Sequence, residues 1–274
     1  MSRTPYDPTA FRQFEYEGWE RLSAGYHRHW QALTTQVVPD LLAVADVASG
    51  AQVLDVACGP GYVSAAAAAR GATTRGVDFS ENMNALARRN FPELEFQTAD
   101  AEDLPFADES FDAVLINFGV LHFPNPETAL SEAHRVLKSG GRLAFTNWAE
   151  AENSAISIAM KAIAEKGSLR AGLPPGTPLY RFADPDECRT VLTEVGFTSV
   201  VSKEIQLTWH LPRPDMLMET SQQATARMSG LLNAQDPEKL PDILAAMTAG
   251  CAPYERDGVT ELAMPAALTV GEKL

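Results

Sequence analysis

Short apolar runs alternate with longer amphipathic segments between residues 52 and 148. The runs are rich in Val, Leu, Ile and Phe, which favours strands that are buried on both faces. The expected strands are Gln52–Ala57, Thr73–Asp78, Leu94–Thr98, Phe111–Asn117 and Gly141–Asn147. This repeated strand–helix order predicts an α/β fold, a doubly wound parallel sheet with helices covering both faces.

Capping residues mark the helices between these strands. The expected helices are Gly61–Arg70, Glu81–Arg89 and Glu127–Leu137. Gly71 ends the first, Ser80 is placed to cap the second, and Pro126 occupies the first position of the third. Each is the kind of residue found at such a boundary, so the helices agree with the strand pattern.

The second half of the chain is less regular. Asp184–Gly196 reads as a capped helix, followed by a strand over Thr198–Leu211 and a final core strand over Leu262–Val270. We interpret the chain as one domain, 1–274. Its core is formed by 36–150, 183–211 and 258–274, and helical cap or lid elements by 1–35, 151–182 and 212–257.

Composition narrows the classes of partner. The 274 residues are 45% hydrophobic and carry a formal net charge of −14, which argues against nucleic acid. Three cysteines without Cys/His ligand spacing argue against a disulfide framework, and no metal site is expected. Neither a signal peptide nor a membrane-spanning run is visible, so a cytoplasmic protein is expected. Whether the chain forms a homodimer is left open.

The segment VLDVACGPGYV, residues 53–63, is a buried strand that breaks into a glycine turn. Gly59 and Gly61 let the backbone turn tightly and approach a ligand. The helix that follows directs its N-terminal amides at the same place, which favours a negative group. Ligands of open parallel sheets bind at the carboxyl ends of strands, so a cofactor is expected here.

Polar groups follow the next three strands as well. Asp78 ends the second strand, where a carboxylate accepts hydrogen bonds from ribose hydroxyls. Asp100–Ala101–Glu102 follows the third strand and suits an adenine amino group. Asn117–Phe118–Gly119 ends the fourth, where the reacting centre is expected. A glycine turn followed at a distance by an Asp occurs both in sites that bind NAD and in sites that bind adenosyl cofactors, so this pair alone does not choose between them.

Four segments of the sequence together resemble the motifs of a known protein family. They are VLDVACGPGYV, GVDFSENM, TADAEDLPFADESFDAVLINFGVLHF and EAHRVLKSGGRLAF. They resemble successive motifs of the class I S-adenosylmethionine-dependent methyltransferases. The most similar subgroup is the small-molecule type that includes the ubiquinone/menaquinone-biosynthesis C-methyltransferases. The resemblance covers residues 50–147 and extends loosely to the last strand. It implies a Rossmann-like seven-stranded sheet whose final strand runs antiparallel beside the fifth.

The resemblance also implies a set of cofactor-binding residues. Together they would surround the methionine part of the cofactor, bind its ribose, line the adenosine, contact the adenine and border the sulfonium. One of them, Tyr26, would lie on the N-terminal lid. The full set is Asp55, Ala57, Gly59, Gly61, Asp78, Phe79, Met83, Asp100, Ala101, Glu102, Asn117, Phe118 and Tyr26. Two departures are visible. Ser139 replaces a frequent proline, and Ser64 occupies the third glycine position of a dinucleotide fingerprint, which disfavours NAD.

The acceptor side is expected near the fourth strand. His122 is the candidate general base, needed only if the acceptor loses a proton, and a His that merely packs in its loop is an equal alternative. Aromatic and Met side chains suggest a fairly apolar pocket for a small organic acceptor. The candidates are Trp19, Trp148, Tyr180, Arg181 and Met216. Cys58 is expected to be an inert filler.

Two other classes of function stay open. An NAD(P)-dependent oxidoreductase predicts a Tyr-x-x-x-Lys motif, which the sequence lacks. A protein of the same fold that holds the cofactor without transferring a methyl group shares every motif above. The acceptor, and whether O, N, C or S is methylated, is left open.

Overall fold

The computed structural model describes residues 6–274 and divides the chain into two compact units. We call Thr34–Ala149, Gly176–Ile205 and Ala266–Leu274 the sheet unit. The described residues up to Leu33, together with Glu150–Pro175 and Gln206–Pro265, form the helical unit. The chain therefore passes between the units several times.

The sheet unit contains a seven-stranded sheet in the order β3-β2-β1-β4-β5-β10-β6. The strands are β1 (Gln52–Val56), β2 (Thr73–Asp78), β3 (Glu95–Thr98), β4 (Phe111–Ile116), β5 (Leu137–Trp148), β6 (Thr198–Ile205) and β10 (Ala266–Glu272). The pairs from β3 to β5 are parallel, whereas β10 is antiparallel to both β5 and β6. The expected α/β fold with an antiparallel last strand is confirmed.

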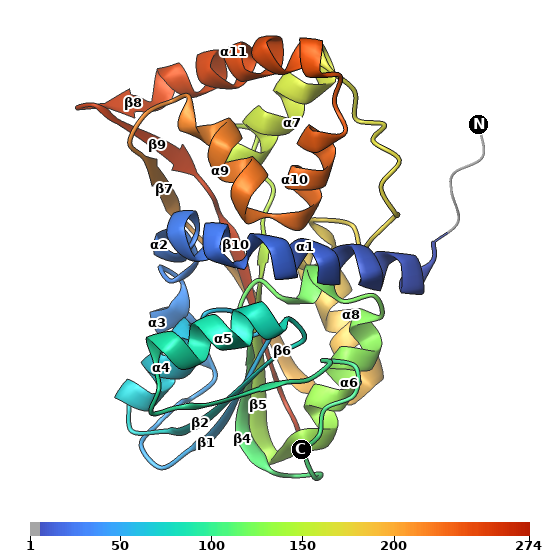
Figure 1. The fold of residues 1–274 in the computed structure, drawn as a ribbon. Coiled ribbons are helices and arrows are strands. Elements are labelled where there is room, and N and C mark those ends of the chain that lie inside the picture. Colours follow the sequence, from blue (N-terminus) through green and yellow to red (C-terminus); the bar gives the residue numbers. More distant parts are fainter. Residues whose placement is uncertain (1–5) are drawn as a thin grey trace. The chain divides into compact units, whose positions relative to one another are not determined.

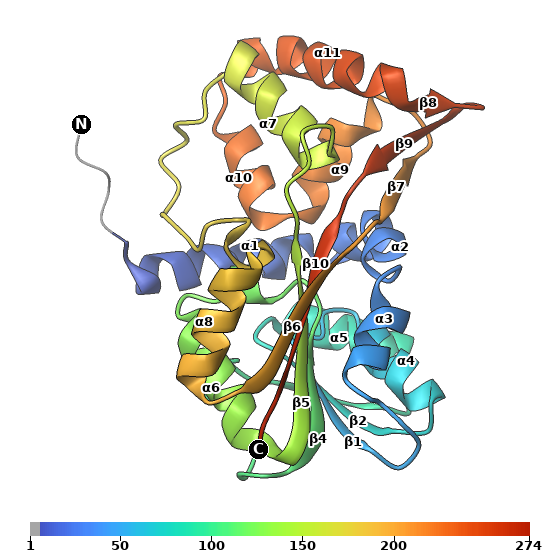
Figure 2. The ribbon, with the colours of Figure 1, turned by 180° about the vertical axis from the view of Figure 1, so that it is seen from behind.

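Helices cover both faces of this sheet (Figures 1 and 2). On one side lie α3 (Val38–Val44), α4 (Tyr62–Ala69) and α5 (Glu81–Asn90), and on the other α6 (Pro126–Val136) and α8 (Pro185–Val195). Val53 packs into the core beneath α3 and α4, and the next residue, Leu54, into the core beneath α6 and α8. Because neighbouring strand residues face opposite sides, a sheet covered twice needs continuous apolar runs.

The helical unit contains α1 (Pro8–His29), α7 (Ala155–Lys166), α9 (Met216–Ala224), α10 (Ala226–Asn233) and α11 (Leu240–Cys251). In α1, a Cβ added to Gly25 would lie 1.8 Å from the Gln223 carbonyl oxygen, and one on Gly18 would lie 2.5 Å from the Ala226 Cβ. These glycines therefore let α1 lie directly against α9 and α10.

The described part of the chain also contains a short α-helix and several 3₁₀ turns. They are α2 (Gln31–Thr34) and the 3₁₀ turns η1 (Val120–His122), η2 (Arg181–Ala183), η3 (Pro237–Lys239) and η4 (Ala252–Tyr254). The helical unit also holds a small sheet, β7-β9-β8, formed by β7 (Thr208–Leu211), β9 (Val259–Ala263) and β8 (Glu255–Arg256). None of the described helices is long and apolar enough to span a membrane.

Two expected strands differ in the structure. The strand expected over 198–211 is divided between β6 and β7, and the one expected over 262–270 between β9 and β10. β6 and β10 pair in the large sheet, whereas β7 and β9 pair in the small one. Pro265, between β9 and β10, has no N–H to donate to a ladder, which suits the break there.

Candidate cofactor site

The glycine turn after β1 contains three residues with left-handed backbone: Ala57 at φ 56°, Gly59 at φ 51° and Gly61 at φ 88°. A Cβ on Gly61 would lie 2.8 Å from the Phe96 ring, so packing excludes a side chain there. Above Gly59 the nearest atom to an added Cβ is the Met83 sulfur at 4.0 Å. The turn therefore presents bare backbone beside open space at Gly59.

Asp55 connects β1 to the start of α4. Its Oδ2 accepts hydrogen bonds from the Ser64 backbone nitrogen at 2.9 Å and the Ser64 hydroxyl at 2.7 Å. The side chain is buried, and this burial raises the pKa of the carboxyl to about 7. Its Oδ1 is buried without a hydrogen-bond partner among the described residues. That oxygen is an unused acceptor directly before the turn.

Asp78, at the end of β2, holds the same turn from the neighbouring strand. Its Oδ2 accepts from the Gly59 nitrogen and its Oδ1 from the Ser80 nitrogen, both at 2.9 Å. A carboxylate oxygen has lone pairs for more than one donor, so an oxygen that accepts from a backbone nitrogen can also accept from a ligand hydroxyl. Next to it, Phe79 is half-buried, and Met83 is buried in α5.

The loop after β3 is a tight turn built by acidic side chains. Asp100 Oδ1 accepts from the Glu102 nitrogen at 3.0 Å. The two oxygens of Glu102 accept from the backbone and side-chain nitrogens of Asn125 at 2.7 and 2.9 Å. Ala101, between the two acids, is buried. The Glu102 carboxylate thus ties this loop to the start of α6.

The end of β4 is held by one hydroxyl of β5. Thr146 Oγ1 accepts from the Phe118 nitrogen at 2.8 Å and donates to Asn117 Oδ1 at 2.7 Å. Phe118 has a left-handed backbone with φ 54°, and its ring stacks on Trp148 with centroids 3.9 Å apart. Thr146 is fully buried and was not singled out in the sequence, because its role requires knowing that β4 and β5 are neighbours.

His122 lies in η1, directly after this turn, and is half-buried. Its backbone nitrogen donates to the Gly119 carbonyl at 2.9 Å. A Cβ on Gly119 would lie 2.8 Å from the Ala57 Cβ, so the ends of β4 and β1 touch. The order of strands reverses between β1 and β4, which is where open α/β sheets bind ligands.

The expected acceptor residues are divided between the two units. Trp148, Tyr180 and Arg181 belong to the sheet unit, and Trp19 and Met216 to the helical unit, as does Tyr26, which was expected at the cofactor. The rings of Trp19 and Tyr26 meet edge to face at 5.5 Å. The Arg181 guanidinium pairs with Glu187 at 2.6 Å and with Glu127 at 2.5 Å, which joins α8 to α6.

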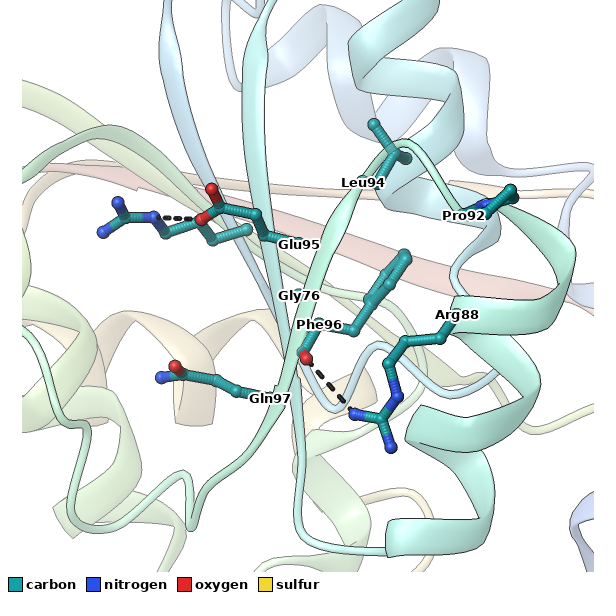
Figure 3. A pocket seen from close by; sticks show the side chains of 8 residues that line it. Gly76, Arg88, Pro92, Leu94, Glu95, Phe96 and Gln97 are labelled. Atoms are coloured by element: carbon teal, nitrogen blue, oxygen red, sulfur yellow. Dashed lines mark hydrogen bonds and ion pairs between the residues drawn. The ribbon is translucent and has the colours of Figure 1, made fainter.

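A separate hollow of about 450 Å³ lies along the edge strand β3 (Figure 3). Its lining contains the ion pair Arg75–Glu95 at 3.0 Å and the hydrogen bond from Arg88 to the Phe96 carbonyl at 3.3 Å. The eight described residues that line it include none of the strand-end residues above. The hollow and the strand-end site are therefore different places.

Comparison with known proteins agrees with this arrangement. The family profile described as "Methyltransferase domain" matches residues 54–145. A demethylmenaquinone methyltransferase of Paenarthrobacter aurescens is 33% identical over 194 residues, which cover 67% of this chain and 74% of the relative. The chain belongs to the class I S-adenosylmethionine-dependent methyltransferase family. The NAD(P)-dependent alternative is therefore not favoured.

Other members share parts of the chain. A demethylmenaquinone methyltransferase of Clavibacter sepedonicus is 47% identical over 125 residues, which cover 44% of this chain and only 48% of the relative. A Haemonchus contortus phosphoethanolamine N-methyltransferase, solved with S-adenosylhomocysteine, has a TM-score of 0.59 at 17% identity, covering 97% of this chain and 61% of that one. The [4+2]-cyclase SpnF also has a TM-score of 0.59, at 18% identity, with 100% of both chains covered. The two structural likenesses concern the fold.

Proposed function

We propose that the chain transfers the methyl group of S-adenosylmethionine to a small, fairly apolar organic acceptor. The observation that carries the proposal is the Asp78 carboxylate, which is hydrogen-bonded to the bare backbone of Gly59 at the point where the strand order reverses. A carboxylate beside a glycine turn is suited to a ribose and to the chain attached to it.

The glycine turn fits the amino-acid part of this cofactor. Asp55 Oδ1 is a buried acceptor without a partner among the residues described, and an ammonium group would supply the missing donor. The open space beside Gly59, which a side chain at this position would fill, leaves room for a ligand. We therefore assign the methionine part to Asp55, Ala57, Gly59 and Gly61.

The adenosine part is assigned to the ends of β2 and β3. Asp78 would accept hydrogen bonds from the ribose hydroxyls, and Phe79 and Met83 would contact the adenosine. Asp100, Ala101 and Glu102 would face the adenine; the buried Ala101 is held in a turn by both acids. This assignment uses residues from neighbouring strands, as a ligand lying across strand ends requires.

When bound, the cofactor supplies a methyl group on a positively charged sulfur, which is already a good leaving group. The protein then has to hold the acceptor in line and exclude water. Asn117 and Phe118 would border the sulfur. His122 would accept a proton if the acceptor has one to lose.

We propose an acceptor with an aromatic ring, of the quinone type named for the relatives. The rings of Phe118 and Trp148 stack on each other and are buried beside the end of β4, and we propose that they form an apolar wall of the acceptor pocket. Tyr180 and Arg181, in the same unit, are the further candidates for this pocket. The acidic net charge agrees with an acceptor that is not a polyanion.

The test has two stages. Calorimetry first compares S-adenosylhomocysteine with NADH, and we expect heat only with the former; binding of NADH alone would overturn the proposal. Transfer of label from methyl-labelled S-adenosylmethionine is then measured with demethylmenaquinol and with a metabolite extract. Cofactor binding without label transfer to either would favour a member of the fold that does not transfer methyl groups.

A further inference from the structure

Asn84 is a fully buried polar residue of α5 that lies between the two strand ends assigned to the adenosine. Its Nδ2 lies 2.9 Å from the Asp78 carbonyl, 3.0 Å from the Ser80 carbonyl and 3.2 Å from the Thr98 hydroxyl. Its Oδ1 lies 3.9 Å from the Cys58 sulfur. One amide group therefore contacts the ends of β1, β2 and β3 together.

The donor directions in this cluster are fixed by chemistry. Thr98 Oγ1 donates to Glu81 at 2.5 Å, because a carboxylate only accepts. The Thr98 oxygen is then an acceptor toward Asn84, as are the two carbonyls. A flipped amide would place Oδ1 against three acceptors, so Nδ2 must face them and Oδ1 must face the thiol.

Asp78 is thus held on its backbone as well as on its side chain. Its carbonyl accepts from Asn84 and from the Ala99 nitrogen at 3.1 Å, and its carboxylate accepts from Gly59 and Ser80. The contacts to the carbonyl fix the position of the Asp78 backbone, and the contacts to the carboxylate fix the orientation of its two oxygens. Loss of the Asn84 amide would remove a buried contact from the residue assigned to the ribose.

We propose that Asn84 is a positioning residue that sets the Asp78 carboxylate for the cofactor ribose. The inference rests on the proposed cofactor site. The inference also explains the position of Cys58. Burial raises the pKa of this thiol well above its usual value, so it stays protonated and is a weak donor within reach of Asn84 Oδ1 at 3.9 Å and of the Gly59 carbonyl at 3.8 Å. Cys58 therefore supports the amide and takes no part in group transfer.

The experiment is a double-mutant cycle read by calorimetry with S-adenosylhomocysteine. Asn84→Leu is expected to weaken binding by about tenfold, the equivalent of one buried hydrogen bond. Asp78→Ala is expected to weaken it by about thirtyfold or more, because a charged acceptor is lost. In the Asp78→Ala background, adding Asn84→Leu is expected to change binding by no more than about twofold, since the group on which Asn84 acts is gone.

Two further variants separate positioning from general destabilisation. Asn84→Asp keeps the shape of the side chain, replaces the donating nitrogen by an acceptor, and serves as the variant if leucine does not fold. Asn233→Leu is the matched control, because Asn233 is an exposed helical asparagine whose amide donates to Ser229 at 3.3 Å, within its own helix. It is expected to bind as the wild type does.

The outcomes distinguish the two proposals. A wild-type protein that does not bind S-adenosylhomocysteine overturns the proposed function. Binding by the wild type together with unchanged affinity in Asn84→Leu or Asn84→Asp overturns the role of Asn84 alone. Fully additive losses in the cycle would show that Asn84 acts independently of Asp78, and would also overturn it.

Discussion

The Asp78 carboxylate accepts a hydrogen bond of 2.9 Å from the backbone nitrogen of Gly59. This contact joins the end of β2 to the turn that follows β1, and it orients a charged acceptor beside backbone that carries no side chain. Neither residue is unusual in its own strand or turn. Their juxtaposition is what makes the strand ends suited to a ribosyl cofactor.

Gly59→Ala is expected to reduce S-adenosylhomocysteine affinity by at least about tenfold, because a methyl group would enter the space assigned to the ligand. The matched control is Gly140→Ala. Both glycines have left-handed backbones, at φ 51° and 78°, and neither has an atom closer than 4.0 Å to an added Cβ. Each change is therefore expected to cost about 1 kcal/mol of folding free energy from strain. Equal affinities of the two variants in calorimetry would remove Gly59 from the site.

The pH dependence of stability is expected to report Asp55. Its native pKa of about 7 lies above the usual value of 3.8, so the folded protein keeps a proton that the unfolded chain has released. The free energy of unfolding should therefore fall as pH rises from about 4 to 7, by at most about 4 kcal/mol. Asp55→Asn removes the titrating group, and urea unfolding at several pH values should show a shallower decline. An identical slope in the variant would contradict the raised pKa.

The same variant tests the assignment of the methionine part. The ionised Asp55 carboxylate is expected to favour the cofactor ammonium, so S-adenosylhomocysteine affinity should rise between about pH 6 and 8 in the wild type. The amide that Asp55→Asn introduces is neutral at every pH, so this variant should bind more weakly at high pH and lose the rise. A pH profile that does not differ between the two proteins would separate Asp55 from the ammonium.

Thr146→Val keeps the shape of the side chain and removes the hydroxyl shared by Phe118 and Asn117. We expect a loss of about 2 kcal/mol in unfolding free energy, since a buried N–H and a side-chain oxygen lose their partner. Thr269→Val is the control, because Thr269 is equally buried in β10 and its hydroxyl pairs with Ser202 at 2.8 Å. Only Thr146→Val should also lower S-adenosylhomocysteine affinity, by about threefold. A similar affinity loss in both variants would indicate a general effect of destabilisation.

His122→Ala is expected to lower the rate of methyl transfer more than it changes cofactor affinity, by about a hundredfold if the residue is a general base. Label transfer to a working acceptor gives the rate, and calorimetry gives the affinity. Near-wild-type turnover would leave His122 as a residue that packs in its loop.

Local signals were sufficient for the first half of the chain. Apolar runs, Ser80, Gly71 and Pro126 predicted the elements from β1 to α6, because apolar strand runs and helix caps depend on neighbouring residues alone. The second half was harder. Residues 198–211 have one strand-like pattern, yet β6 and β7 belong to different sheets. Which strand a segment pairs with depends on residues far away in the chain.

The same distinction holds for the site. Gly59, Gly61 and Asp78 could be proposed from the sequence, because a turn and a strand end show in residue type and spacing. Asn84 and Thr146 were missed, since a buried amide or hydroxyl has no local signature and its partners lie on other elements. Ser64 was noticed only as a departure from a glycine pattern, although it is the partner of Asp55.

The sequence by itself determined the family, the order of strands and helices from β1 to β5, and the types of residue at the strand ends, because these follow from patterns over a few neighbouring positions. Only the tertiary structure decided which strands pair, how β10 enters the sheet, and which buried hydroxyl and amide groups hold Asp78 and Phe118 in place. The physical reason is that hydrogen bonds between distant segments form only when the sheet brings their partners within reach.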